Sequence, residues 1–172
     1  WAPNGHRIAY DLTIPADSSG IWLVNPDGSG KKHLGLGRFP DWSPGHQIVF
    51  EGRLGSSERK PQLWVTDSSA TDSTQLTTND FVDNHAPEWS PDGKWIAWAP
   101  IHKGVSEIWI MRADGSAPRK LADRGLTPAW GPDSERIVFA GTSQESDYTA
   151  LWMIRRGGSD LRQLTFPASS NQ

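Results

Sequence analysis

The stretch that decides the fold is PEWSPDGKWIAWAPIHKGVSEIWIMRADGSAPRKL, residues 87–121. Its features occur in four copies: a Trp that opens a turn, an apolar run, a second Trp in another apolar run, and a Leu twelve residues after that second Trp. The opening residues are Trp1, Trp42, Trp89 and Trp130, the second ones are Trp22, Trp64, Trp109 and Trp152, and the closing ones are Leu34, Leu76, Leu121 and Leu164. A period of 41 to 47 residues indicates a repeat architecture with one small sheet per copy.

Each copy predicts four short strands. The first surrounds the opening Trp, and the fourth is a short stretch ending at the Leu; the second and third are the apolar runs, such as WIAW and IWIM in residues 95–98 and 108–111. Pro-Asp-Gly and Pro-Asn-Gly supply turns in which Gly takes a positive φ, and no segment has helical periodicity over a useful length. Strands that are apolar on both faces need cover on both faces, which radially stacked sheets supply. The sequence therefore predicts an all-β fold, a β-propeller of four-stranded antiparallel blades at approximately residues 1–41, 42–88, 89–129 and 130–172 of a single region, with the eight repeated Trp residues in the core.

Composition excludes several classes of protein. The formal net charge of -3 argues against a general nucleic-acid binder. No run approaches the roughly 20 apolar residues that a membrane-spanning helix needs. The chain has no Cys, so disulfides and thiolate metal sites are excluded.

The repeated motifs resemble a known family. P-x-W-S-P-D-G, I-W-x-M-x-A-D-G-S and a closing R-x-L, most complete in residues 87–121, are similar to the TolB-type β-propeller repeat. The resemblance implies a ring of about six blades, of which this chain holds four, and we expect further blades or another chain to cover the two terminal blades. It also implies an extracytoplasmic protein, periplasmic or secreted. We expect it to bind a protein or peptide and to need no cofactor.

Loop lengths predict where a partner would bind. The interval from the second Trp to the Leu is constant, whereas the interval from the Leu to the next Pro is 6, 11 and 7 residues. The loops whose length varies between repeats therefore lie on one rim, where loops carry function without disturbing the sheets that they connect. The candidate partner-binding residues on that rim are Arg38, Phe39, Asp41, Asp80, Asp83, Asn84, His85, Glu88, Asp123 and Arg124. The alternative for these polar side chains is a solvated loop in which Asn and Asp stabilise local turns.

Trp95 is a further candidate contact residue. The sibling copies have Arg7, Gln47 and Arg136 at its position, and a position that is polar elsewhere suggests partial exposure. The alternative is a local packing choice on the rim.

Catalytic motifs are absent from the sequence. There is no G-x-S-x-G nucleophile elbow and no H-E-x-x-H zinc motif. Asp80, Asp83 and Glu88 offer the oxygen ligands that suit calcium, although no EF-hand spacing supports such a site.

Two hypotheses for the function follow. The first is a non-enzymatic platform that binds a protein or peptide at the variable rim and the mouth of the central channel. The second is an accessory propeller that gates substrates for a serine peptidase or other hydrolase whose catalytic domain lies outside this chain.

Overall fold

The computed structural model describes residues 1–13, 19–53, 60–78, 82–142 and 148–166. These residues form four antiparallel sheets, in which each strand pairs with its neighbours in chain order. The first sheet contains β1 (Ile8–Leu12), β2 (Gly20–Val24) and β3 (Lys32–Gly35), and the second contains β4 (Arg38–Trp42), β5 (Ile48–Gly52), β6 (Gln62–Thr66) and β7 (Ser73–Gln75). The third contains β8 (Asp83–Trp89), β9 (Trp95–His102), β10 (Val105–Arg112) and β11 (Arg119–Asp123), and the fourth contains β12 (Gly125–Trp130), β13 (Arg136–Thr142), β14 (Thr149–Arg155) and β15 (Arg162–Gln163). The predicted all-β architecture of stacked blades is confirmed, and among the described residues there is no helix that could cross a membrane.

The first sheet has three strands and the other three have four. In the later sheets the opening Trp is the last residue of the innermost strand, as Trp42 is in β4 and Trp89 is in β8. Trp1 is the first residue of the sequence, so the described chain contains no residues that correspond to the body of this strand. As a result, β1 is the inner edge of its sheet.

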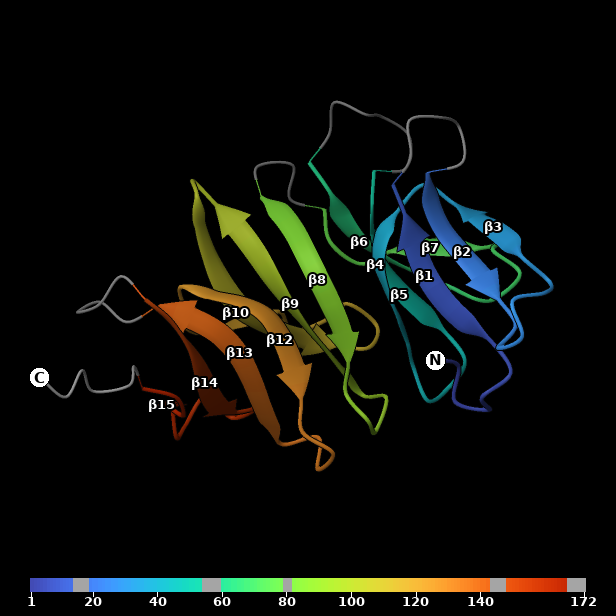
Figure 1. The fold of residues 1–172 in the computed structure, drawn as a ribbon. Coiled ribbons are helices and arrows are strands. Elements are labelled where there is room, and N and C mark those ends of the chain that lie inside the picture. Colours follow the sequence, from blue (N-terminus) through green and yellow to red (C-terminus); the bar gives the residue numbers. More distant parts are fainter. Residues whose placement is uncertain (14–18, 54–59, 79–81, 143–147, 167–172) are drawn as a thin grey trace, which may run out of the picture.

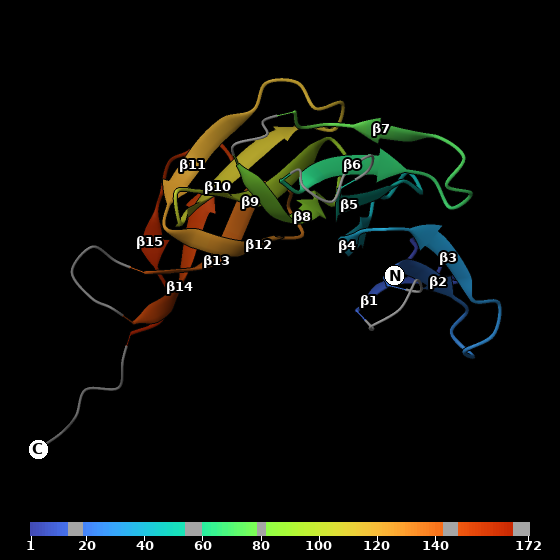
Figure 2. The same cartoon turned by 90° about the horizontal axis from the view of Figure 1, so that it is seen from above.

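The four sheets stand side by side in an open arc. Figure 2 shows the innermost strands β4, β8 and β12 along the concave side, with β7, β11 and β15 on the convex side. The first sheet, β1–β3, and the fourth sheet, β12–β15, lie at opposite ends of the arc (Figures 1 and 2). The first and fourth blades therefore do not close on each other within this chain.

Hydrogen-bonded turns join the strands at the rim where loop lengths are constant. In the third blade, Gly93 has a φ of 68° and its N–H donates to the Ser90 carbonyl oxygen at 2.8 Å. The Ser90 hydroxyl also accepts the Trp95 N–H at 3.0 Å. A residue with a Cβ would be strained at this φ, which explains the Pro-Asp-Gly sequence.

Each complete blade has the same irregularity in its innermost strand. The residue before the Pro has a positive φ, 50° at Phe39, 47° at Ala86 and 45° at Thr127. The pairing register with the next strand shifts at the same place in all three. This β-bulge leaves the positive-φ residue and the Pro outside the ladder, and regular pairing resumes at Asp41 and Glu88.

The opening Trp of each blade packs against the blade before it. Trp42 contacts a cluster containing Leu23 of the first blade, Trp89 one containing Leu63 of the second, and Trp130 one containing Ile108 of the third. These three Trp side chains are buried. A typical buried Trp removes 150–250 Å² from water, which contributes roughly 4–6 kcal/mol before entropy is considered.

The prediction that all eight repeated Trp residues are core is wrong for Trp1, which is 69% exposed, and the second Trp of each blade is only half-buried. No described blade precedes Trp1, so the surface that covers its siblings is missing. At the opposite end of the arc, a side chain is likewise exposed at a position that is buried in the preceding blades. Leu151 of β14 is 39% exposed, whereas Leu63 and Ile108 at the equivalent positions are 0% exposed because the next blade covers them. The two terminal faces thus carry side chains that the fold buries at every internal junction.

Candidate functional site

The concave side of the arc carries a shallow cavity of about 400 Å³. The three bulges line it through Phe39, Pro40, Ala86, Pro87, Thr127 and Pro128, together with Asp41, Glu88 and residues 9–11 of β1. The cavity therefore lies where a propeller has its central channel.

Asp41 and Glu88 occupy equivalent positions in this cavity and link neighbouring blades. Asp41 Oδ2 accepts the backbone N–H of Trp89 at 2.7 Å, and Glu88 Oε1 accepts that of Trp130 at 3.3 Å. Each carboxylate thus holds the opening Trp of the next blade. Ala129, the equivalent residue of the fourth blade, has no side chain that could make such a bond.

Burial makes both carboxyl groups harder to ionise. Desolvation raises the pKa of Glu88 from 4.5 to about 7, with a further contribution from the negative charge of Asp41 and an opposing one from the Trp130 N–H. Desolvation likewise raises the pKa of Asp41, against the N–H groups of Trp89 and Trp42. We therefore expect the protonation state of these carboxyl groups to affect the stability of the blade junctions at the channel.

Arginine and exposed apolar side chains lie at or next to the starts of the innermost strands β4 and β12. The Arg38 guanidinium lies 5.2 Å from the centroid of the Phe39 ring, and its Nε is 3.9 Å from Asp11 Oδ2 of the first blade. Phe39, Leu36 and Leu126 are all exposed large apolar residues, and Phe39 also lines the cavity. Arg124, next to the start of β12, is exposed as well. Such a mixture is typical of the centres of protein interfaces.

Asp83 and His85, at the start of β8, contact the second blade, Asp83 through an ion pair and His85 through a hydrogen bond. Lys60 Nζ lies 2.9 Å from Asp83 Oδ2, and His85 Nδ1 lies 2.8 Å from Oε2 of the buried Glu51. Both candidates are half-buried, so part of each side chain remains accessible.

Asn84, by contrast, is 4% exposed. Its Oδ1 accepts the Trp98 indole N–H at 2.9 Å, and its Nδ2 donates to the Pro61 carbonyl oxygen at 3.4 Å. The structure therefore places this candidate in the packing between the second and third blades, where it is shielded from a partner.

The remaining candidates are dispersed. Asp123 is exposed and its Oδ1 lies 2.8 Å from Lys120 Nζ. Trp95 lies at the other rim, next to the Ser-Pro-Asp-Gly turn. Asp80 is outside the described residues. Of the proposed calcium ligands, Asp83 and Glu88 sit at opposite ends of β8, and no three His, Asp or Glu side chains gather as a metal site in the described part of the chain.

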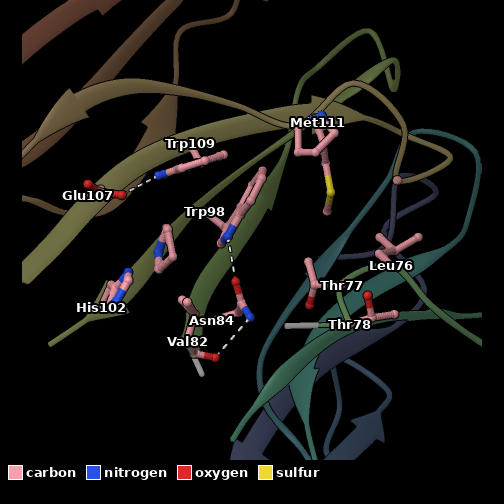
Figure 3. Close-up of a pocket in the computed structure, with 13 residues that line it drawn as sticks. Leu76, Thr77, Thr78, Val82, Asn84, Trp98, His102, Glu107, Trp109 and Met111 are labelled. Atoms are coloured by element: carbon pink, nitrogen blue, oxygen red, sulfur yellow. Dashed lines mark hydrogen bonds between the residues drawn. The ribbon is translucent and has the colours of Figure 1, made fainter. Parts of the chain in front are cut away.

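A second cavity, which the sequence does not indicate, lies between the second and third blades. Its volume is about 540 Å³, and Figure 3 shows Leu76, Thr77 and Thr78 across from Trp98 and Asn84. The indole N–H of Trp98 is bonded to Asn84, and that of Trp109 donates to Glu107 Oε2 at 2.7 Å. Since both N–H groups are occupied, the rings offer apolar faces that suit a bulky apolar group. The long connector between Leu76 and Pro87 is the only feature of the sequence that marks this place.

Comparison with known proteins identifies the repeat. The profile of the TolB beta propeller domain matches residues 39–172. The chain belongs to the TolB beta propeller domain family. The predicted family is thereby confirmed, and the match includes the three complete blades.

Two curated relatives illustrate the relationship. The Tol-Pal system protein TolB of Anaeromyxobacter dehalogenans (strain 2CP-C) is 38% identical over 155 residues, which are 84% of this chain and 35% of that protein. An uncharacterized protein of Agrobacterium fabrum is 27% identical over 146 residues, which are 80% of this chain and 48% of that protein. The chain thus spans less than half of either relative.

Solved structures confirm the fold. TolB from Acinetobacter baumannii matches with a TM-score of 0.77 at 22% identity, over 95% of this chain and 42% of that one. A prolyl endopeptidase matches with a TM-score of 0.66 at 13% identity, over 98% of this chain and 28% of that one. At these identities the likeness concerns the fold alone.

Proposed function

We propose that this TolB-type propeller is a non-enzymatic platform that binds a protein partner at the variable-rim mouth of its central channel. One observation carries the proposal: the exposed Phe39 lines the concave cavity with the Arg38 guanidinium 5.2 Å from its ring, and Leu36, Leu126 and Arg124, next to the starts of β4 and β12, are exposed as well. Large apolar side chains are usually withdrawn from such a surface in a monomeric protein, and their clustering with arginine is characteristic of binding hot spots.

The relatives support a setting for this partner. The curated relative from Anaeromyxobacter is named as a Tol-Pal system protein, so we propose an extracytoplasmic location and a partner protein of that system. The uncovered Trp1 and Leu151 support a larger ring, in which additional blades cover both terminal faces. The channel mouth would then be enclosed on all sides.

The proposal is tested by titrating the chain with recombinant Pal protein from Anaeromyxobacter dehalogenans in a calorimeter. Phe39→Ala and Arg38→Ala are expected to weaken binding at least about tenfold, since each truncates a hot-spot side chain. Phe166→Ala is the matched control, because Phe166 is an exposed phenylalanine in the segment after β15, at the far end of the arc. Absence of binding by the unmodified chain, or an equal loss in the control, would overturn the proposal.

The alternative is a propeller that restricts access to the catalytic domain of a larger peptidase. The fold likeness to a prolyl endopeptidase favours it. The discriminating observation is the sequence of the complete gene. A downstream α/β segment with G-x-S-x-G would support the peptidase role, whereas a signal peptide with a short N-terminal domain would support the platform.

A further inference from the structure

The junction between the third and fourth blades carries an unusual group of side chains at the rim of short turns. The Arg112 guanidinium lies 5.3 Å and the Arg156 guanidinium 4.9 Å from the centroid of the Trp95 ring. Together with Lys94, these residues line a cavity of about 590 Å³. Cation–π contact of this kind restrains the long arginine side chains on the aromatic surface, so the three groups form a preorganised set.

The fold itself does not require this set. Trp95 pairs with Arg112 across the β9–β10 hairpin, and Gln47 and Asp67 are the corresponding residues of the second blade. Ala113 then stands where Arg156 stands in the following blade. The second and third blades also pack through a buried core with those residues, so the Trp and two Arg residues are a local feature of one junction rather than part of the repeat.

Several hydrogen-bond donors of this cavity have no acceptor among the described residues. Within the described residues, neither the Trp95 indole N–H nor the Arg112 guanidinium donates a hydrogen bond, and the Nε of Arg156 is buried without an acceptor. Arginine and tryptophan supply donors only. A ligand that completes this site must therefore bring acceptors.

One oxygen of each carboxylate that lines the cavity accepts hydrogen bonds from nearby groups. Asp92 Oδ1 accepts from the Ser90 hydroxyl at 2.6 Å and from the Lys94 N–H at 3.1 Å. Asp114 Oδ1 accepts the Ser116 N–H at 2.9 Å, and Glu135 accepts from Arg156. These bonds leave the indole N–H and the Arg112 guanidinium as the available donors.

We propose that this junction is a second binding site, which takes a glutamate or aspartate side chain from an acidic peptide segment of a partner protein. The carboxylate accepts from the Arg112 guanidinium and the Trp95 indole N–H, while the methylene groups of the acidic side chain lie against the indole. Arg–carboxylate hydrogen bonds are among the stronger polar contacts in proteins. The nearby carboxylates of Asp92, Asp114 and Glu135 disfavour a dianionic phosphate more than a singly charged carboxylate, since repulsion grows with charge.

This site is independent of the channel mouth, because it lies at the opposite rim. Its direct test is the indole region of a ¹⁵N-correlated NMR spectrum, in which loss of a peak in Trp95→Phe assigns the Trp95 Nε1–H. A peptide of alternating Glu and Gly residues is titrated into the unmodified chain. The control ligands are the corresponding Gln and Gly peptide and inorganic phosphate.

The expected result is a saturable shift of the Trp95 indole peak with the Glu peptide and none with the Gln peptide. Arg112→Gln should weaken this binding at least about tenfold, as expected when a charged hydrogen-bonding partner is lost. Arg155→Gln is the matched control: Arg155 is an exposed arginine of the neighbouring turn, with Nε 3.7 Å from Asp160 Oδ2, and it does not line the cavity. No shift, an equal shift with the Gln peptide, a stronger response to phosphate, or equal weakening by both arginine variants would overturn the proposal.

Discussion

Replacing Glu88 by Gln should raise stability at neutral and alkaline pH and remove much of its pH dependence. The carboxyl group of Glu88 lies in the concave cavity, and burial together with the negative charge of Asp41 raises its pKa from 4.5 to about 7. A glutamine at this position cannot ionise, yet its side-chain oxygen remains able to accept the Trp130 N–H that Glu88 accepts at 3.3 Å.

The sign follows from linkage between protonation and folding. Because the folded-state pKa is raised, the protonated carboxyl contributes its stabilisation fully below about pH 4.5, and this contribution is lost as the pH rises through about 7. A rise in pKa from 4.5 to about 7 corresponds to about 3 kcal/mol at about 1.4 kcal/mol per pKa unit. Since the side chain is only partly buried, solvent screening reduces the expected effect to about 1–2 kcal/mol.

The assay is urea unfolding followed by tryptophan fluorescence at several pH values between about 4.5 and 8. Between these limits the unmodified chain should lose about 1–2 kcal/mol more stability than Glu88→Gln. Asp83→Asn is the control, because it removes a carboxylate from the same strand that pairs with Lys60 and does not link blades at the channel. Parallel pH profiles for Glu88→Gln and the unmodified chain would refute the assignment.

Three further outcomes are expected. Trp89→Ala should lower the free energy of unfolding by about 3–5 kcal/mol and Trp1→Ala by less than about 0.5 kcal/mol, because Trp89 is 5% and Trp1 69% exposed; equal losses in denaturant titrations would contradict the blade-on-blade packing. Asn84→Ala should cost about 1–3 kcal/mol, since it leaves the buried Trp98 indole N–H without its acceptor; a loss below about 0.5 kcal/mol in the same titrations would show that this hydrogen bond contributes little. The purified chain should hydrolyse neither peptides nor glycosides in substrate panels, because its sequence lacks a G-x-S-x-G or H-E-x-x-H motif; turnover that Asp83→Asn abolishes would contradict the platform.

Much of the architecture could be predicted because the repeat is local. The twelve-residue interval from the second Trp to the Leu and the Pro-Asp-Gly turns lie within single hairpins, where chain geometry fixes the register. The candidate site was less accessible to such reasoning. Asn84 reads as a loop residue beside Asp83 and His85, but its amide satisfies the Trp98 indole in the interior. An asparagine can be either a solvated loop residue or a buried hydrogen-bonding residue. Only the neighbouring residues that pack around it distinguish these two roles.

The sequence by itself determined the number of repeats, the approximate positions of the strands and the family. It also distinguished a rim whose loops have constant length from a rim whose loops vary in length. The tertiary structure decided what the side chains do, because their partners are remote in the chain. Asp41 and Glu88 bond to Trp N–H groups 48 and 42 residues away, and this contact cannot be read from either local segment. The same reason applies to Trp1 and Trp89, which occupy equivalent positions in the repeat but differ in burial. A repeat pattern specifies which side chain faces the neighbouring blade, whereas burial depends on whether that blade is present.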